Sequence, residues 1–179
     1  MVLGVDELLK LVKEKNLVTD LSDRELTNPE GCGFDLRLGQ VYEISGEAYL
    51  GIEERKTAEA KVVSEYKDGI SRVFLLKSGF QVLVTTIESV KLPANLTANL
   101  WARSTLYRSG IILSGGNVAP GYEGKLSFTL YNSGKANVKI EMGARIAHIL
   151  FYEIKGKANK YRGQWKGGRV VTKKLEKQV

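Results

Sequence analysis

Cysteine and histidine each occur once in this chain, as Cys32 and His148. A single cysteine excludes an intrachain disulfide. A zinc site of the usual cysteine and histidine type needs more such ligands than one chain provides here. A nucleophile activated by histidine has only His148 as its partner. We therefore expect any chemistry to rely on carboxylates, hydroxyls, backbone donors, arginine, lysine and a bound magnesium ion.

Long apolar runs are also missing, because no stretch reaches the roughly 18 apolar residues that cross a membrane. Residues 1–17 lack the basic start, apolar middle and small-residue cleavage site of a signal peptide. These features predict a cytoplasmic protein without a membrane contact. The length of 179 residues and the 43% hydrophobic content suit one globular domain. We place that domain at residues 1–168, followed by a basic tail at 169–179.

The charge balance is basic, with a formal net charge of +7 and an isoelectric point of about 9.4. Basic proteins often bind polyanions. The sequence has no helix-turn-helix, zinc finger or aromatic RNA-binding signature, so we expect no nucleic-acid partner. A nucleoside triphosphate is a smaller polyanion that also suits this charge. The alternative is that the lysines of the last 25 residues form a solvated tail.

Hydrophobic periodicity predicts one helix and many short strands. Residues 5–15 carry apolar side chains at helical spacing, with acidic residues early and lysines late. From residue 34 onward the apolar positions alternate in short stretches separated by glycine turns, and the charged residues 51–70 form an excursion. This pattern indicates an all-β barrel or jelly roll. The predicted strands are 34–38, 41–44, 72–76, 80–86, 96–102, 126–131, 138–140 and 145–152.

The stretch from Trp101 to Gly134 combines cations, hydroxyls and a glycine-rich turn. Arginine offers charge-assisted donors to phosphate oxygens, so the first half predicts a phosphate site. The alternative is a strand end that turns into a short helix capped by Ser104 or Thr105. A helix N-terminus also favours phosphate, so the two are compatible. The candidate phosphate-binding residues are Arg103, Ser104, Thr105 and Arg108.

The following glycine-rich loop lets the backbone approach a flat base closely, since glycine has no Cβ. It could equally be a plain hairpin connection. The candidate residues for binding a base and sugar are Gly116, Asn117, Val118 and Tyr122.

A second glycine-containing segment, KYRGQWKGG at 160–168, follows the last predicted strand. It is either an exposed basic tail or a lid that closes over a triphosphate and excludes water, through Lys160, Arg162 and Gln164. Asp35, which alternates with Arg37, is either a structural ion pair or a functional carboxylate. We interpret His148 as a packed strand residue and assign no role to Cys32.

Taken in order, these segments resemble the trimeric dUTPase and dCTP deaminase superfamily. FDLRLG at 34–39, VTTIESVKLPANLTANLWARSTL at 84–106, GYEGKLSFTLYNSG at 121–134 and GARIAHILF at 143–151 are similar to its motifs. The N-terminal helix and KYRGQ at 160–164 resemble the deaminase branch. The resemblance implies a distorted β-barrel or jelly roll of the β-clip type, with one N-terminal helix. It also implies a homotrimer with active sites between subunits and magnesium bound through the substrate phosphates.

Two positions depart from the family pattern. Thr129 stands where deaminases carry a glutamate, and a threonine is a poor proton shuttle. Ala119 stands where dUTPases carry an aspartate that orients the attacking water. Asp35 and Glu123 are the nearest replacement carboxylates in motif terms. We expect dUTP hydrolysis to dUMP and pyrophosphate first, with zinc-independent dCTP deamination or nucleotide binding without efficient turnover as the alternatives.

Overall fold

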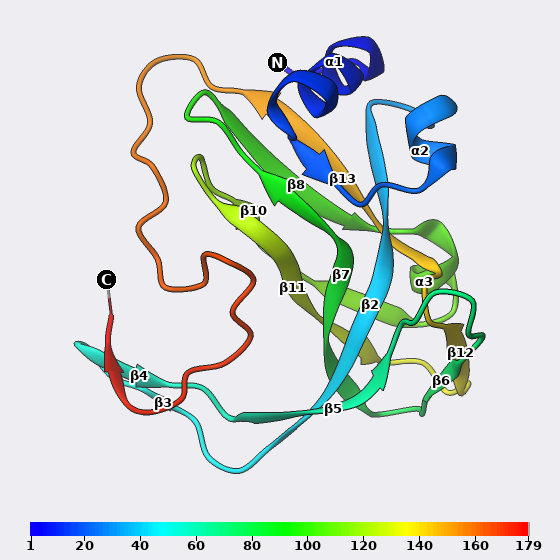
Figure 1. Cartoon of the computed structure of the whole chain (residues 1–179). Helices are drawn as coiled ribbons and strands as arrows, with labels where there is room; N and C mark the ends of the chain where they lie inside the picture. Colours follow the sequence, from blue (N-terminus) through cyan, green and yellow to red (C-terminus); the bar gives the residue numbers. More distant parts are fainter. Residues whose placement is uncertain (179) are drawn as a thin grey trace.

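The computed structural model describes residues 1–178 as a largely β structure with three short helices. Figure 1 shows one large curled sheet with two helices at one end and a long irregular C-terminal segment along one side. The helices are α1 (Val5–Lys15), α2 (Asp23–Thr27) and α3 (Ser104–Arg108). Within residues 1–178, no helix has the length and apolar character needed to cross a membrane.

Nine strands form the main sheet, which confirms the predicted mainly β fold. Its path is β10, β8, β13, β2, β7, β11 and β9, with β1 beside β7 and β5 beside β2. These strands are β1 (Val18–Thr19), β2 (Gly33–Ser45), β5 (Glu59–Glu65), β7 (Gln81–Lys91), β8 (Leu96–Ala102), β9 (Ile111–Ser114), β10 (Asn117–Val118), β11 (Glu123–Asn132) and β13 (Arg145–Glu153).

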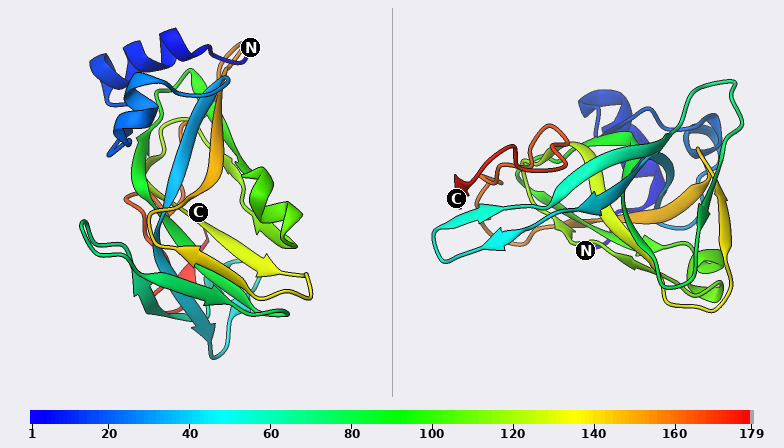
Figure 2. Two further views of the ribbon diagram at one scale, coloured as in Figure 1. Left: turned by 90° about the vertical axis from the view of Figure 1, so that its right-hand side faces the viewer. Right: turned by 90° about the horizontal axis from the view of Figure 1, so that it is seen from below.

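Two small sheets complete the fold. Strands β6 (Val73–Leu76) and β12 (Val138–Glu141) pair with each other, while β3 (Tyr49–Leu50), β4 (Glu54–Lys56) and β14 (Glu176–Lys177) form a three-stranded sheet. The charged excursion expected at 51–70 is thus the β3–β4 hairpin followed by β5. Figure 2 shows this hairpin projecting away from the main sheet and meeting the end of the chain.

The helix predicted at residues 5–15 is confirmed with the same bounds, and it buries Leu8 and Leu11 against the core. The structure also contains α2, a helix that the sequence pattern does not predict. Helix α3 confirms the short helix given as the alternative at the phosphate segment. The N-cap of α3 is Arg103, and among the described residues no side chain caps this helix. The expectation that Ser104 or Thr105 caps it is therefore wrong, because both already lie within the helix.

Strand β2 is buried on both faces at its start, which the alternating pattern of residues 34–38 does not reveal. Phe34, Leu36 and Leu38 are completely buried, and Phe34 packs edge-to-face on Phe151. Asp35, on the opposite face, is only 1% exposed. An alternating hydrophobic pattern normally indicates a strand with one buried face and one solvent-exposed face. Here that face is covered by charged residues of other elements.

The C-terminal segment runs beside the main sheet, contacts the start of β11 and ends against the β3–β4 hairpin (Figure 1). It approaches β11 so closely that a Cβ on Gly124 would lie 2.4 Å from the backbone nitrogen of Gly168. Gly124 also has a φ of +135°, which glycine adopts readily. The sequence predicts a solvated basic tail after Gly168. In the structure this segment contacts the β3–β4 hairpin as far as residue 178, and Thr172 within it is buried.

Candidate functional site

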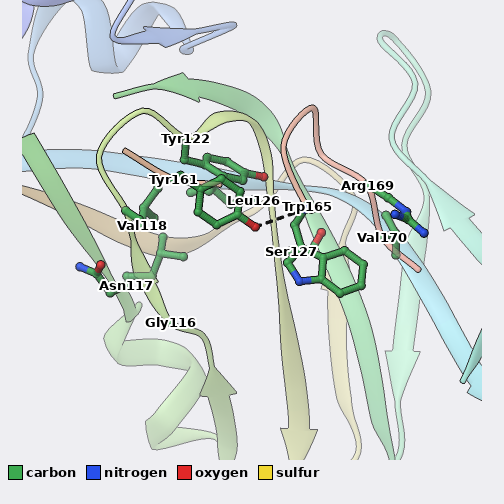
Figure 3. Close-up of a pocket in the computed structure, with 12 residues that line it drawn as sticks. Gly116, Asn117, Val118, Tyr122, Leu126, Ser127, Tyr161, Trp165, Arg169 and Val170 are labelled. Carbon is green, nitrogen blue, oxygen red and sulfur yellow. Dashed lines mark hydrogen bonds between the residues drawn. The ribbon is translucent and has the colours of Figure 1, made fainter. Parts of the chain in front are cut away.

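A cavity of about 340 Å³ lies between the glycine-rich loop and the C-terminal segment. We call it the aromatic cavity. Figure 3 shows the rings of Tyr122 and Tyr161 at the top, the indole of Trp165 to their right, and the loop residues to the left and below. Its lining comes from β8, β10, β11, the loop between the last two, and residues 161–170. The lining residues are Leu100, Gly116, Asn117, Val118, Ala119, Tyr122, Leu126, Ser127, Tyr161, Trp165, Arg169 and Val170.

The four residues predicted to bind a base and sugar all line this cavity. Strand β10 pairs with β8, which fixes the loop, and Val118 is buried. The side-chain nitrogen of Asn117 donates to Thr97 Oγ1 at 2.7 Å and to the carbonyl oxygen of Ala98 at 3.1 Å. That nitrogen therefore holds the loop to β8 rather than pointing a free donor at a ligand.

Tyr122 and Tyr161 form the roof of the aromatic cavity. Their rings meet edge-to-face with centroids 5.3 Å apart. The Tyr122 hydroxyl donates to the carbonyl oxygen of Lys125 at 2.6 Å. Burial raises the pKa of Tyr122 to about 12. The hydroxyl therefore stays neutral at ordinary pH and does not act as a base.

The predicted phosphate residues lie elsewhere on the chain. Ser104, Thr105 and Arg108 are exposed on α3. A second hollow of about 290 Å³ is lined by Arg103, Thr105 and residues of β12 and β13. The resemblance implies active sites between subunits that use both the phosphate and the base residues. Within the described residues of a single chain, Arg103 and Thr105 line one hollow and the base and sugar candidates line another.

Arg103 belongs to a buried charge cluster centred on Asp35, which we call the guanidinium cluster. Arg103 Nη1 lies 2.8 Å from Asp35 Oδ2, and Arg145 Nη1 lies 2.9 Å from the same oxygen. His148 Nδ1 lies 2.8 Å from Asp35 Oδ1. The sheet register sets this arrangement, since β13 pairs His148 directly with Asp35. The cluster also includes Arg24, 3.7 Å from Asp35 Oδ2.

Electrostatics keep Asp35 ionised. Burial alone raises the pKa of its carboxyl, but the hydrogen bond from His148 and the charges of Arg103 and Arg145 outweigh burial, so the pKa lies below its usual value. An ionised carboxylate only accepts hydrogen bonds, so His148 carries its proton on Nδ1. With both oxygens occupied, Asp35 fits a structural role and does not fit a catalytic base or a magnesium ligand. This corrects the choice of Asp35 as a catalytic candidate and the interpretation of His148 as a simple packing residue.

Acidic side chains near the aromatic cavity are scarce. None of the residues that line it in the described chain is an aspartate or glutamate. Ala119 lines the cavity itself. Thr129 lies two residues beyond the lining residue Ser127 on β11, so the two side chains share a face of the strand. Glu123 does not line the aromatic cavity. It is half-exposed, lies 3.9 Å from both Lys91 Nζ and Lys166 Nζ, and lines a separate hollow beside Thr19.

Of the three lid candidates, Lys160 and Gln164 differ in their contacts. The Gln164 side-chain oxygen accepts a hydrogen bond from Arg55 Nη2 at 2.5 Å, so it is turned toward the β3–β4 hairpin. Lys160 is exposed beside Gly121, and the backbone nitrogen of Tyr161 donates to the carbonyl oxygen of Pro120 at 2.6 Å. The segment therefore lies over the loop, as the lid interpretation predicts.

Sequence reasoning missed several residues that shape these sites. Arg145 and Arg24 join the cluster around Asp35, and the buried Glu25 accepts a hydrogen bond from the Asp35 backbone nitrogen at 2.9 Å. Trp165 and Arg169 line the aromatic cavity. Trp165 lies within residues 160–168, the segment proposed as a lid, so its position in the sequence could have indicated a place in the site. Nothing in the local sequence marks the others, since their partners are distant in the chain.

Comparison with known proteins decides the family. The profile of the dCTP deaminase-like family matches residues 2–154. The chain belongs to the dCTP deaminase-like family. A protein of Dictyoglomus thermophilum named dCTP deaminase, dUMP-forming, is 34% identical over 163 residues, which cover 88% of this chain and 83% of the relative. The dCTP deaminase of Thermococcus kodakarensis is 31% identical over 159 residues, 88% of this chain and 90% of the relative.

Among solved structures, the 2'-deoxycytidine 5'-triphosphate deaminase of Agrobacterium tumefaciens aligns with a TM-score of 0.66. The alignment covers 86% of the present chain, which spans 48% of that chain, at 18% identity. This likeness supports the fold of the dCTP deaminase-like family. The resemblance to the dUTPase and dCTP deaminase superfamily is thus confirmed.

Proposed function

We propose that this protein acts on dCTP and deaminates its cytosine ring. The observation that carries the proposal is the aromatic cavity, whose wall from β8, β10 and β11 lies within residues 2–154, the part of the chain that matches the dCTP deaminase-like family. Water adds to C4 of the base and ammonia leaves, giving a uracil deoxynucleotide. The names of relatives favour dCTP over the dUTP that the short glycine-rich loop suggests.

The chain's residues support binding more directly than they support proton transfer. The cavity offers flat aromatic surfaces and backbone from Gly116, with Arg169 as a cation at its edge. Deamination needs a group that moves a proton from water to the leaving amine. Thr129 and Ala119 supply no such group, and Tyr122 stays neutral. Turnover by this chain is therefore expected to be slow.

A second candidate function is nucleotide binding without turnover. The lack of a carboxylate along the described lining of the cavity favours it. In that case the protein senses or sequesters the nucleotide.

As a second step, we propose that the protein hydrolyses the dUTP formed by deamination to dUMP and pyrophosphate. Some relatives are named dUMP-forming, which requires loss of pyrophosphate as well as of ammonia. We retain Lys160, Arg103, Ser104, Thr105 and Arg108 as proposed contacts of the triphosphate, and Glu123 as the remaining candidate carboxylate.

We also propose a homotrimer in which the phosphate residues of one subunit complete the aromatic cavity of another. The separation of the two hollows on one chain supports this. The arginines among the phosphate residues would neutralise negative charge on the bound triphosphate. Neutralising this charge is a main requirement of phosphoryl chemistry. Magnesium would bind through the substrate phosphates, and a cytoplasmic location stays a prediction.

Separate incubations with dCTP and dUTP, each with magnesium, test the function, with products resolved by chromatography and ammonia measured enzymatically. Ammonia release from dCTP supports deamination, and a uracil deoxynucleotide monophosphate adds the second step. Turnover of dUTP without any reaction of dCTP would contradict the proposal. Binding of dCTP by calorimetry without turnover supports the second candidate.

A further inference from the structure

The β3–β4 hairpin is an element that the proposed function does not use. It projects from the main sheet, and its strand β4 pairs with β14 near the end of the chain. Thr57 and Thr172 exchange hydrogen bonds, because each backbone nitrogen donates to the other residue's Oγ1 at 2.9 Å. The hairpin therefore holds the segment that carries Tyr161, Trp165 and Arg169 into the aromatic cavity.

Arg55 on β4 lies at the centre of this contact. Its guanidinium carbon is 4.6 Å from the centroid of the Trp165 ring. Its Nη2 donates to Gln164 Oε1 at 2.5 Å, and its Nε lies 3.5 Å from Glu176 Oε1. One side chain thus contacts the lid at two successive residues and reaches the chain end as well.

The same tryptophan has a second cation beside it. The guanidinium carbon of Arg169 is 5.6 Å from the Trp165 centroid, and its Nη2 lies 2.7 Å from Glu176 Oε2. Glu176 therefore bridges the two arginines. A cation near an indole face is attracted by the ring, and most strongly where water is partly excluded. Arg55 is mostly buried, with 18% of its side chain exposed.

We propose that Arg55 is a positioning residue that fixes Trp165 and Gln164 over the nucleotide cavity. Trp165 lines the cavity while Arg55 does not, so Arg55 acts through Trp165. The inference rests on the proposed function in one respect, that the aromatic cavity is the nucleotide site. Without Arg55, the backbone bonds from Tyr161 to Pro120 and from Gly167 to Glu123 still anchor the segment. These bonds do not involve the indole ring, and of the two guanidinium groups beside the ring only the more distant one, that of Arg169 at 5.6 Å, would then remain.

Arg55 does not touch the nucleotide, so its loss acts through Trp165, whose ring must then be ordered when the nucleotide binds. We expect nucleotide binding to weaken by about tenfold. The fold should persist, because the core of the main sheet lies away from the hairpin.

The test uses the full chain with Trp101→Phe, which leaves Trp165 as its single tryptophan. In that background Arg55→Ala, Arg55→Lys and Lys56→Ala are compared. Lys56 is exposed on the same strand and is the matched control. The readouts are Trp165 emission and its quenching by acrylamide, trypsin cleavage at Lys160, Arg162 and Lys166, and dCTP affinity by calorimetry.

For Arg55→Ala we expect red-shifted, more quenchable emission, faster cleavage and about tenfold weaker dCTP binding. Arg55→Lys should be intermediate, because lysine keeps the charge but lacks the planar fork. Lys56→Ala should match the parent. Unchanged emission and cleavage in Arg55→Ala would overturn the proposal, as would altered emission with unchanged dCTP affinity. If the parent binds neither dCTP nor dUTP, the proposed function fails, while emission and cleavage still decide whether Arg55 holds the segment.

Discussion

The aromatic cavity and the guanidinium cluster are built by opposite means. The cluster joins residues of paired strands, and the ladder between β2 and β13 fixes its geometry. The cavity depends on a long irregular segment that reaches it after the last main strand. One region is charged, with ionic contacts at 2.8–2.9 Å around a buried carboxylate, while the other is lined mostly by neutral side chains.

This difference separates two roles within one chain. Residues of the cluster satisfy one another, so they support the fold and leave Asp35 no spare lone pair for chemistry. Residues of the cavity leave neutral surfaces available to a ligand but contribute no acid. Substitutions in the cluster should therefore affect stability first, and those in the cavity should affect ligand handling first. The following predictions test that division in decreasing order of expected effect.

Replacing the central carboxylate should cause the largest loss. Asp35→Ala leaves Arg103, Arg145 and His148 without their shared partner. These partners keep 21–38% of their side chains exposed, so their unpaired groups are partly solvated, and we expect a loss of about 1–3 kcal/mol, below that of a fully buried pair. Urea unfolding of the variant measures the loss. Asp68→Ala, at an exposed carboxylate, is the control and should change stability by less than about 0.5 kcal/mol. Equal effects of the two substitutions would contradict the structural role of Asp35.

Adding an acid beside the cavity should change activity and leave the fold intact. Thr129→Glu places a titratable group at the position where the family's deaminases carry glutamate. General acid–base catalysis typically contributes about 10²–10⁴ in rate. We expect ammonia release from dCTP to rise at least about a hundredfold. Thr129→Gln has the same size without the proton shuttle and should not raise the rate. If the rate of ammonia release rose in both variants, the size of the side chain at position 129, and not proton transfer, would explain the gain.

Removing Arg103 should lower the stability of the guanidinium cluster and weaken triphosphate binding. Each effect should be smaller than those of the two preceding substitutions. Its side chain is 29% exposed, so Arg103 contacts Asp35 and still reaches solvent, where a phosphate can approach it. We expect Arg103→Ala to weaken triphosphate binding by about tenfold or more, measured by calorimetry. Arg72→Ala, an exposed control on the same chain, should bind normally. Unchanged affinity in Arg103→Ala would show that the phosphate site lies elsewhere.

The acid side of the pH–stability curve should report Asp35. Its pKa is lowered in the folded state, so the ionised form favours folding. This contribution is complete above the unfolded pKa, about 3.9, and is lost as the pH falls through the folded pKa. Denaturation at a series of pH values from 6 downward should show a steeper loss in the parent than in Asp35→Asn. Parallel curves would mean that Asp35 does not drive the acid transition.

The sequence predicted elements with a strong local pattern and failed where partners are remote. Helix α1 and strand β8 have the predicted bounds, because helical spacing and a proline break mark them. The partnership of Asp35 and His148 joins residues 113 positions apart and depends on strand register, which local pattern does not give. The glycine-rich loop lines the aromatic cavity, and its role in binding a base stays a prediction. It is separated from Arg103 because β10 pairs with Ala98 and Asn99, whereas Arg103 follows the far end of β8.

The pairing of β4 with β14 also bears on how the protein folds. Arg55 and Glu176 are 121 positions apart, so their contact closes a very long loop of chain. Non-local contacts of this kind form slowly, after the entropy of closing the loop has been offset by other structure. The main sheet and its ion pairs can thus assemble while residues 160–178 are still unstructured. We expect the cavity to acquire its aromatic roof last, as a final docking step on an already folded barrel.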